Sequence, residues 1–165
     1  MPGVLIRYAR DADLDGLRAL EDNSFASDHL TRRSLRRLIS RPSAAVRVAA
    51  REPGGPVHGY SLVLFRKGSS VARLYSIAVA DERRGTGLGR LLLADAERVA
   101  ATRRKRVLKL EVRVDNAGAI RLYERRGYRL VGRDAGYYAD KTDALRYEKP
   151  LAVTARRAAQ RKRGA

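Results

Sequence analysis

Residues 71–114 hold the pattern that most restricts how this chain can fold: an extended segment, a glycine-rich turn, a helix and a second extended segment. The pattern predicts strands at 71–80 and 107–114, with a turn at 85–89 that leads into the helix. The apolar side of this helix is expected to carry Leu88, Leu91, Leu92 and Val99. Two strands joined by a crossover helix form a parallel pair with a right-handed connection. Their carboxyl ends border a crevice in which ligands bind.

The flanking segments predict further strands and helices around this pair. Alternating or apolar runs indicate strands at 4–9, 46–50, 57–66, 128–133 and 144–150. Three more helices are expected: one capped by Asp11 or Asp13, one capped by Thr31, and one that runs from Asp115 or Asn116 to Arg126 and stops at Gly127. The sequence therefore predicts an α/β protein of the α+β type, with a mixed, mostly antiparallel sheet and flanking helices.

Length and composition limit the possible chemistry. The 165 residues are 44% hydrophobic and fit one domain, expected at 1–150 and followed by a flexible basic tail at 151–165. Cysteine is absent and the only histidines are His29 and His58, so disulfides and thiolate or histidine-rich metal sites are excluded and no metal is expected. No apolar run approaches the ~20 residues of a membrane span. We therefore expect a cytoplasmic protein without a membrane partner.

The glycine-rich turn at 83–90 reads Arg-Arg-Gly-Thr-Gly-Leu-Gly-Arg. Between a strand and a helix, its backbone N–H groups and the helix dipole favour an anion such as a pyrophosphate. The dinucleotide fingerprint G-x-G-x-x-G requires glycine at position 90, where the chain has Arg90. A P-loop requires Gly-Lys followed by Ser or Thr, which the turn lacks. The motif that remains is R-x-x-G-x-G, at Arg84, Gly87 and Gly89. The alternative is a tight turn that binds no ligand.

This spacing resembles the pyrophosphate loop of the GNAT superfamily of N-acetyltransferases. The resemblance extends upstream to Tyr75-Ser76-Ile77-Ala78-Val79, which is similar to the family's fourth strand. Downstream, Leu110-Glu111-Val112, Asn116, Ala119, Leu122-Tyr123 and Gly127-Tyr128 resemble the family's L-x-V…N-x-x-A…L-Y-x-x-x-G-F signature, with Tyr in place of Phe. These motifs cover about residues 71–132, and a weaker similarity extends over 4–150.

The resemblance implies fourth and fifth strands that splay apart, with acetyl-coenzyme A (acetyl-CoA) as co-substrate between them. It implies that backbone groups of Ile77, Ala78 and Val79 hold the pantetheine arm as an added strand. It implies that Asn116 and Tyr123 line the thiol end. The pyrophosphate would be cradled by Arg84, Gly85, Thr86, Gly87, Leu88, Gly89 and Arg90.

Acetyl transfer to an amine requires a neutral nucleophile, a stabilised oxyanion and a proton for the leaving thiolate. Glu111, on the polar side of its strand, is a candidate base; the alternative is a structural salt bridge with Lys109 or Arg113. The resemblance implies that Tyr123 protonates the thiolate, the alternative being a core tyrosine beside Ile120. A backbone N–H near Val79 is expected to stabilise the oxyanion.

The choice of amine is indicated by a looser resemblance to the ribosomal-protein-alanine acetyltransferase branch. Leu110-Glu111-Val112-Arg113, Tyr137-Tyr138, Asp143-Ala144-Leu145 and Glu21-x-x-Ser24-Phe25 carry it. Where that branch usually follows Phe25 with a Pro and Trp segment, this chain has Ala26-Ser27-Asp28-His29-Leu30. The branch implies a protein or peptide N-terminus as acceptor, with Tyr137 and Tyr138 beside it or simply covering the end of the sheet. A small-molecule amine is the alternative acceptor.

The net charge of +18 introduces a third hypothesis, a basic RNA- or ribosome-associated binding protein. The tail carries five of these charges, which leaves +13 on residues 1–150, and thirty of the 36 basic residues are arginine. The outer face of the helix after Thr31 is expected to carry Arg32, Arg33, Arg36, Arg37 and Arg41. The sequence contains no RNA- or DNA-binding motif, which argues against RNA binding as the main function. RNA or ribosome docking is therefore expected only as an accompaniment to catalysis.

Overall fold

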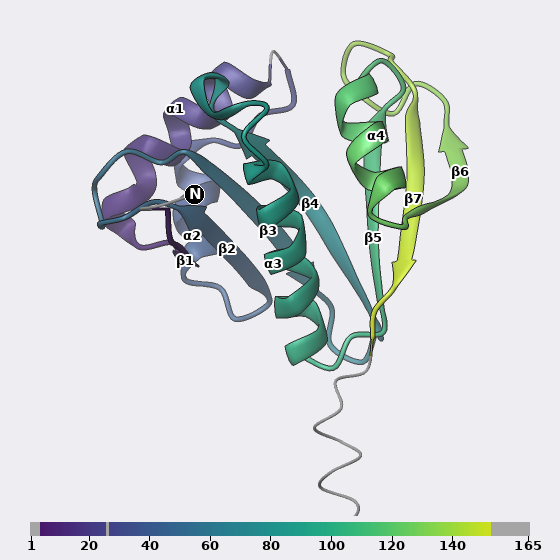
Figure 1. The fold of residues 1–165 in the computed structure, drawn as a ribbon, viewed down its shortest axis with the longest axis horizontal. Helices are drawn as coiled ribbons and strands as arrows, with labels where there is room; N and C mark the ends of the chain where they lie inside the picture. Colours follow the sequence, from purple (N-terminus) through teal and green to yellow (C-terminus); the bar gives the residue numbers. More distant parts are fainter. Residues whose placement is uncertain (1–3, 26, 153–165) are drawn as a thin grey trace, which may run out of the picture.

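The computed structural model describes residues 4–25 and 27–152 and contains a seven-stranded sheet of order β1-β2-β3-β4-β5-β7-β6 (Figure 1). Neighbouring strands are antiparallel except β4 and β5, which pair in parallel. The predicted fold class is thus confirmed. The strands are β1 (Ile6–Tyr8), β2 (Ala44–Ala49), β3 (Gly59–Phe65), β4 (Val71–Val79), β5 (Val107–Arg113), β6 (Arg129–Asp134) and β7 (Ala144–Pro150).

Helices cover the two faces of the sheet. One apolar cluster joins α1 and α2 to β2 and β3, and another joins α3 and α4 to the opposite side chains of the central strands. Short 3-10 turns, η1 and η2, precede α1 and the glycine-rich turn. These elements are η1 (Asp11–Asp13), α1 (Leu14–Ser24), α2 (Arg32–Ile39), η2 (Asp81–Arg83), α3 (Leu88–Thr102) and α4 (Ala117–Arg125).

The expected helix ends are confirmed at two of the three flanking helices. The Thr31 hydroxyl accepts the Ser34 N–H at the start of α2, and Gly127 follows α4 with a φ of +93°. Asp13 occupies the cap position of α1, but its carboxylate makes no cap bond there. It instead accepts the Arg10 N–H and pairs with Arg7, so an aspartate stands at the N-cap of α1 as predicted but does not cap the helix with its side chain.

The apolar side of α3 differs from the prediction at one position. Leu88, Leu92 and Val99 are buried as expected, whereas Leu91 is 42% exposed. Leu93 is buried in its place. The centre of the buried stripe follows Leu88, Leu92 and Ala96, which are spaced four residues apart. Leu91 therefore lies at the rim of the stripe.

β4 and β5 stay paired for only four residues each, Val71–Leu74 and Val107–Leu110. Beyond this point the two strands separate (Figure 1). β4 has a β-bulge at this point. Val63 of β3 pairs with Leu74 and Leu62 pairs with Ser76, so Tyr75 between them has no partner on β3. A bulge bends its strand and increases the local twist. The splayed pair implied by the family resemblance is therefore confirmed.

At the other end of the sheet the contacts continue to Leu151, which is buried and donates its N–H to Arg106 O. The rest of the expected tail, 153–165, lies outside the described residues. None of the helices in residues 4–25 and 27–152 has the length and apolar content to cross a membrane.

Candidate active site

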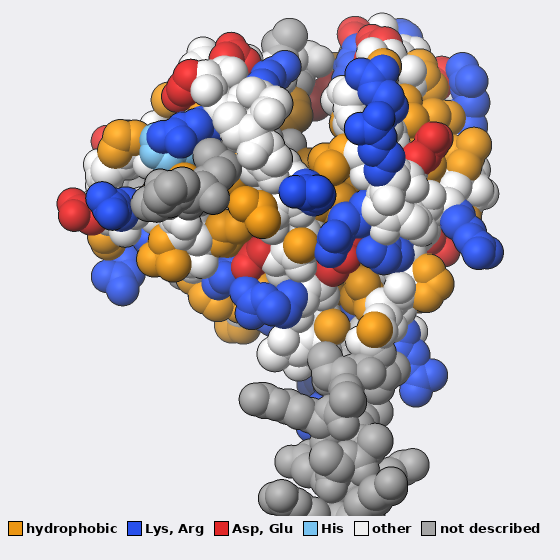
Figure 2. Space-filling view, viewed as in Figure 1, with side chains coloured by type: hydrophobic (Ala, Val, Ile, Leu, Met, Phe, Trp, Pro, Cys, Tyr) orange, Lys and Arg blue, Asp and Glu red, His pale blue; other side chains and the backbone are white. Residues whose placement is uncertain are grey.

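A cavity of about 610 Å³ occupies the region where β4 and β5 diverge. Figure 2 shows the molecule hollowed between its two halves on this side of the sheet. The cavity collects residues from α1, β4, β5, α4 and the β6–β7 connection, which are far apart in the sequence. Its polar lining includes Glu21, Asp28, Arg73, Ser76, Glu111, Arg113, Asn116, Tyr123, Tyr137, Tyr138 and Asp140.

The free edge of β4 presents backbone groups to this cavity. Ala80 donates its N–H to His58 O on the β3 side. Because the direction of backbone groups alternates along a strand, Ala78 also faces β3, whereas Ile77 and Val79 face the gap. Ile77 and Val79 therefore each offer an N–H and a C=O to an extended ligand. Ala78, which was also expected to bind the ligand, directs its backbone groups to β3 instead.

The glycine-rich turn leads directly from β4 to α3. Gly87 precedes α3 with a φ of +86°, and Gly85 has a φ of +73°, a conformation that favours glycine. A Cβ at Gly85 would meet nothing within 4 Å, so the turn is open at this point. No side chain caps α3, and its first turn holds no acidic residue. The N–H groups of this turn thus provide a site for an anion.

The arginines of the turn lie at its surface. Arg84 and Arg90 are exposed, and Arg84 forms an ion pair of 3.1 Å with Asp81. Gly89 lies in the first turn of α3, where a Cβ would be 3.6 Å from Leu122 of α4. The turn therefore lies next to α4, which carries two other candidate residues.

Glu111 lies on β5 and faces the cavity from the first position beyond the paired segment. Its carboxylate accepts the Arg73 Nε–H of β4 at 3.0 Å, and its side chain is 15% exposed. The expected partners Lys109 and Arg113 do not pair with it. Arg113 binds Asp115 and Asp140 instead. Residues two apart on a strand lie on one face but ~7 Å apart, whereas Arg73 reaches across from the adjacent strand.

Tyr123 lies on α4 and is 4% exposed, yet it contributes to the cavity wall. Its ring packs edge-on against Tyr128, with centroids 5.7 Å apart. Burial raises the pKa of Tyr123 well above its ordinary value, so the hydroxyl keeps its proton. Tyr123 is therefore both a core residue and a part of the cavity wall, two descriptions that the sequence left as alternatives.

Asn116 precedes α4 and also lines the cavity. Its Oδ1 accepts the Ala119 N–H at 3.2 Å, which makes it the N-cap of the helix. The side chain thus fixes the start of α4 next to the gap.

Glu21 is a cavity residue to which the sequence analysis gave no role. It is buried on α1 and accepts bonds from Tyr60 Oη and from the Leu30 N–H, the latter at 2.8 Å. Tyr60 Oη also forms a hydrogen bond of 2.9 Å with Ser76 Oγ of β4, in which the serine hydroxyl donates. Glu21 lies four residues after Leu17, on the apolar side of α1, so its spacing predicts burial but not its place in the cavity.

Two loops close over the cavity. Asp28 Oδ2 accepts the Ala139 N–H at 3.1 Å, which ties the α1–α2 connection to the β6–β7 connection. Tyr137 and Tyr138 meet edge-on at 5.0 Å, and Tyr137 Oη accepts a bond of 2.8 Å from Arg73. Burial and Tyr137 raise the pKa of Tyr138 to about 12. The predicted tyrosine pair therefore borders the mouth of the cavity.

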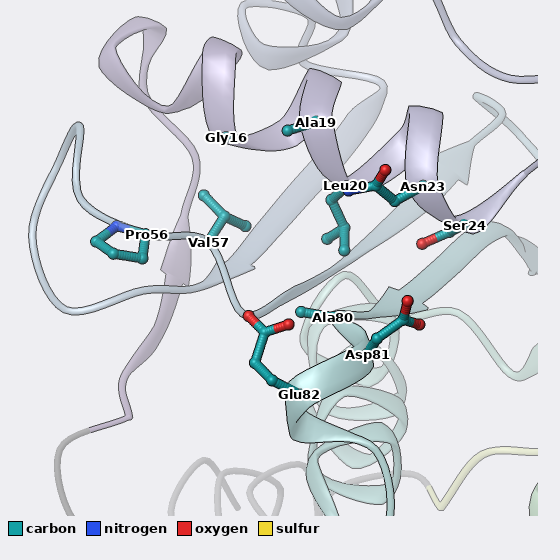
Figure 3. A pocket seen from close by; sticks show the side chains of 10 residues that line it. All are labelled: Gly16, Ala19, Leu20, Asn23, Ser24, Pro56, Val57, Ala80, Asp81 and Glu82. Atoms are coloured by element: carbon teal, nitrogen blue, oxygen red, sulfur yellow. The ribbon is translucent and has the colours of Figure 1, made fainter.

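A smaller cavity of about 270 Å³ lies between α1, the segment at Pro56 and Val57, and the end of β4 (Figure 3). A Cβ on Gly16 would come within 2.6 Å of Val57, so α1 packs closely against this segment. The cavity lies outside the gap and holds none of the candidate residues. Among residues 4–25 and 27–152, no cluster of three or more histidine or carboxylate side chains could hold a metal ion.

Comparison with known proteins gives matches over most of this sheet. The sequence profile of the acetyltransferase (GNAT) family matches residues 7–128. A Bacillus subtilis protein with the provisional name ribosomal protein bS18-alanine N-acetyltransferase is 32% identical over 141 residues, 85% of this chain and 91% of that protein. An N-alpha-acetyltransferase of Saccharolobus solfataricus is 40% identical over 89 residues, 53% of this chain and 51% of that protein.

The structural comparison covers nearly the whole described chain. The crystal structure of the ribosomal-protein-alanine N-acetyltransferase from Brucella melitensis superposes with a TM-score of 0.76 at 30% identity. The superposition covers 89% of this chain and 99% of that chain. The similarity therefore includes the splayed strands and the elements on both sides of them.

Proposed function

This chain belongs to the acetyltransferase (GNAT) family, and we propose that it transfers the acetyl group of acetyl-CoA to the N-terminal α-amino group of a protein or peptide. It is an N-acetyltransferase, and its resemblance to the ribosomal-protein-alanine branch is confirmed. One observation carries the proposal: a single cavity between splayed strands brings a free strand edge, a carboxylate and a buried tyrosine together. We place the reaction in the cytoplasm, where new protein N-termini emerge from ribosomes.

The chain offers complementary groups to each part of acetyl-CoA. Ile77 and Val79 can pair with the amides of the pantetheine arm, as a strand pairs with a sheet edge. The turn at 84–90 can hold the pyrophosphate with the N–H groups at the start of α3. Asn116 and Tyr123, on the far side of the gap, then lie at the thiol end. The fit follows from the open turn, the uncapped helix and the unpaired strand edge.

In the proposed reaction the amine nitrogen attacks the thioester carbon, the C–S bond breaks and an amide forms. Glu111 takes a proton from the ammonium group, directly or through water, so that a neutral amine attacks. A backbone N–H of β4 that the pantetheine arm leaves free stabilises the oxyanion that develops on the carbonyl oxygen. Tyr123, which burial keeps protonated, gives its proton to the departing thiolate. The second proton that the attacking nitrogen loses as the amide forms returns to Tyr123 through water.

Three observations support an N-terminal acceptor. A free α-amino group has a pKa of ~7.7–8.0 against ~10.4 for lysine, so a single carboxylate suffices to deprotonate it near neutral pH. The cavity mouth is bordered by Tyr137 and Tyr138, whose rings can flank an extended peptide. Two relatives named above are an N-alpha-acetyltransferase and a protein provisionally named as a ribosomal protein bS18-alanine N-acetyltransferase.

The decisive experiment measures thiol release from acetyl-CoA with three classes of acceptor at equal concentration. These are short peptides with free N-termini, the same peptides with blocked N-termini and an internal lysine, and small amines such as polyamines and aminoglycosides. We expect turnover with the free N-termini only. Turnover confined to the small amines would overturn the proposed acceptor and leave the acetyl transfer in place.

A further inference from the structure

The end of the molecule opposite the gap carries a cluster of basic side chains on three loops. The loops connect α2 to β2 (40–43), β3 to β4 (66–70) and α3 to β5 (103–106). We call the cluster the basic pole, and it consists of Arg41, Arg66, Lys67, Arg103, Arg104, Lys105 and Arg106. Figure 1 shows α3 ending and β4 and β5 beginning at this end.

Specific contacts hold the three loops together. The Arg103 guanidinium donates to Pro42 O at 2.7 Å and lies over the Phe65 ring at 4.1 Å. Lys105 Nζ donates to Ser69 O at 2.6 Å, and the Arg106 N–H donates to Ser70 O at 2.7 Å. These contacts hold the three loops of the basic pole against one another.

The charge of this surface is not neutralised within the described part of the chain. The three loops contain no Asp or Glu, and none of the seven basic residues forms an ion pair among residues 4–25 and 27–152. Elsewhere the basic side chains are often paired, as Arg73 is with Glu111 and Arg113 with Asp140. The sequence from 153 to 165 adds five basic residues without an acid.

We propose that the basic pole binds RNA through its phosphate backbone, as a docking function separate from acetyl transfer. Five of the seven residues are arginines, whose planar guanidinium groups match phosphate oxygens in pairs. The surface consists of loops and places no helix for insertion into a DNA major groove. Loops of this kind suit an irregular single-stranded phosphate track. Because the gap opens at the other end of β4 and β5, bound RNA leaves it accessible.

The test measures binding of the full-length protein to a fluorescent single-stranded RNA of about 20 nucleotides, at salt concentrations from about 50 to 200 mM. The triple variant Arg41→Gln, Arg66→Gln, Arg106→Gln removes three exposed side chains without any side-chain bond in the structure. We expect about a tenfold loss of affinity and a salt slope shallower by about 2, since each phosphate contact on a single strand contributes about 0.7. Turnover with a free peptide should stay unchanged.

The matched control replaces Arg51, Arg125 and Arg129, three exposed arginines away from the basic pole, with Gln. Its RNA affinity should fall much less. Equal losses in the two variants would overturn the proposal, because binding would then depend on net charge alone. Binding that survives the pole substitutions but disappears on deletion of 153–165 would overturn it as well. So would equal competition by polyglutamate or equal binding of duplex DNA, which would assign the surface to another partner.

Discussion

At the scale of single residues, the ion pair of Arg73 and Glu111 marks the point where the site begins. Register pairs Arg73 with Lys109 and Leu74 with Leu110, so Glu111 is the first β5 residue beyond the paired segment. The 3.0 Å contact joins the two strands just before they part. Arg73 also holds Tyr137 at the cavity mouth. The proposed base is thus oriented by a side chain that reaches the acceptor side.

Replacement of Glu111 tests its proposed role as base. Glu111→Gln keeps the shape of the side chain but removes the proton acceptor, so we expect kcat/KM to fall about 100-fold. The acid limb of the rate profile should disappear with it. The control Glu148→Gln changes a β7 residue outside the cavity and should leave the profile intact. A wild-type profile for Glu111→Gln would give the residue a structural role only.

Replacement of Tyr123 separates chemistry from binding. Tyr123→Phe retains the ring packing against Tyr128 but removes the hydroxyl, so turnover should fall about 100-fold while the affinity for acetyl-CoA changes little. Tyr147→Phe removes another hydroxyl of the same aromatic cluster, one that binds Glu124 instead of lining the cavity. Its turnover should remain near wild type. Equal rates for the two variants would remove Tyr123 from the mechanism.

At the scale of elements, Gly87 at the start of α3 is required because of its positive φ angle, and not because neighbouring atoms leave no room for a Cβ. Gly87→Ala places a Cβ at a φ of +86°, which costs about 1 kcal/mol and disturbs the N–H groups of the turn. We expect a lower free energy of unfolding and a several-fold higher KM for acetyl-CoA. Urea unfolding and initial rates measure the two effects.

The matched substitution at a second glycine should have the opposite sign. A Cβ at Gly118, within α4, would meet nothing within 4 Å. Gly118→Ala should therefore raise the free energy of unfolding by about 0.5 kcal/mol and leave the KM unchanged. If Gly87→Ala and Gly118→Ala changed the free energy of unfolding and the KM in the same way, the positive φ of Gly87 would not be the cause of its effect.

The elements themselves follow closely from local patterns in the sequence. The caps at Thr31 and Asn116 and the glycine after α4 are local signals, and the structure places each where it was predicted. The errors concern side chains whose partners are distant. Asp13 stands at the N-cap of α1 but its carboxylate binds Arg7, and Leu93 is buried where Leu91 was expected, because tertiary packing determined both.

At the scale of the whole molecule, Asp13 links three separate segments. Its carboxylate binds the Arg7 side chain on β1, the Arg10 N–H and the Gly54 N–H. Burial alone would raise the pKa of Asp13, but the bonds from Arg7 and the two N–H groups outweigh it and lower the pKa below its usual range. The carboxylate therefore stabilises the folded chain above about pH 4 and loses this effect as the pH falls through the lowered pKa.

Asp13→Asn should show this dependence directly. At pH 7 we expect a loss of about 2 kcal/mol in the free energy of unfolding, because the partly buried Arg7 side chain loses its anion. The difference from wild type should shrink as the pH falls below about 4. Urea unfolding at several pH values measures it, and Asp15→Asn, at an exposed ion pair with Arg32, is the control and should change little. A constant difference at all pH values would contradict the linkage.

The sequence alone determined the strand order around the crossover, the helix starts and the glycine-rich turn, because periodicity, capping and spacing are properties of short segments. Only the tertiary structure decided that Glu111 pairs with Arg73, that Glu21 enters the cavity and that three loops form the basic pole. These contacts join residues tens of positions apart. The geometry of the cavity contacts depends on the divergence of β4 and β5, which is set by a bulge and by packing on both faces of the sheet and not by local patterns.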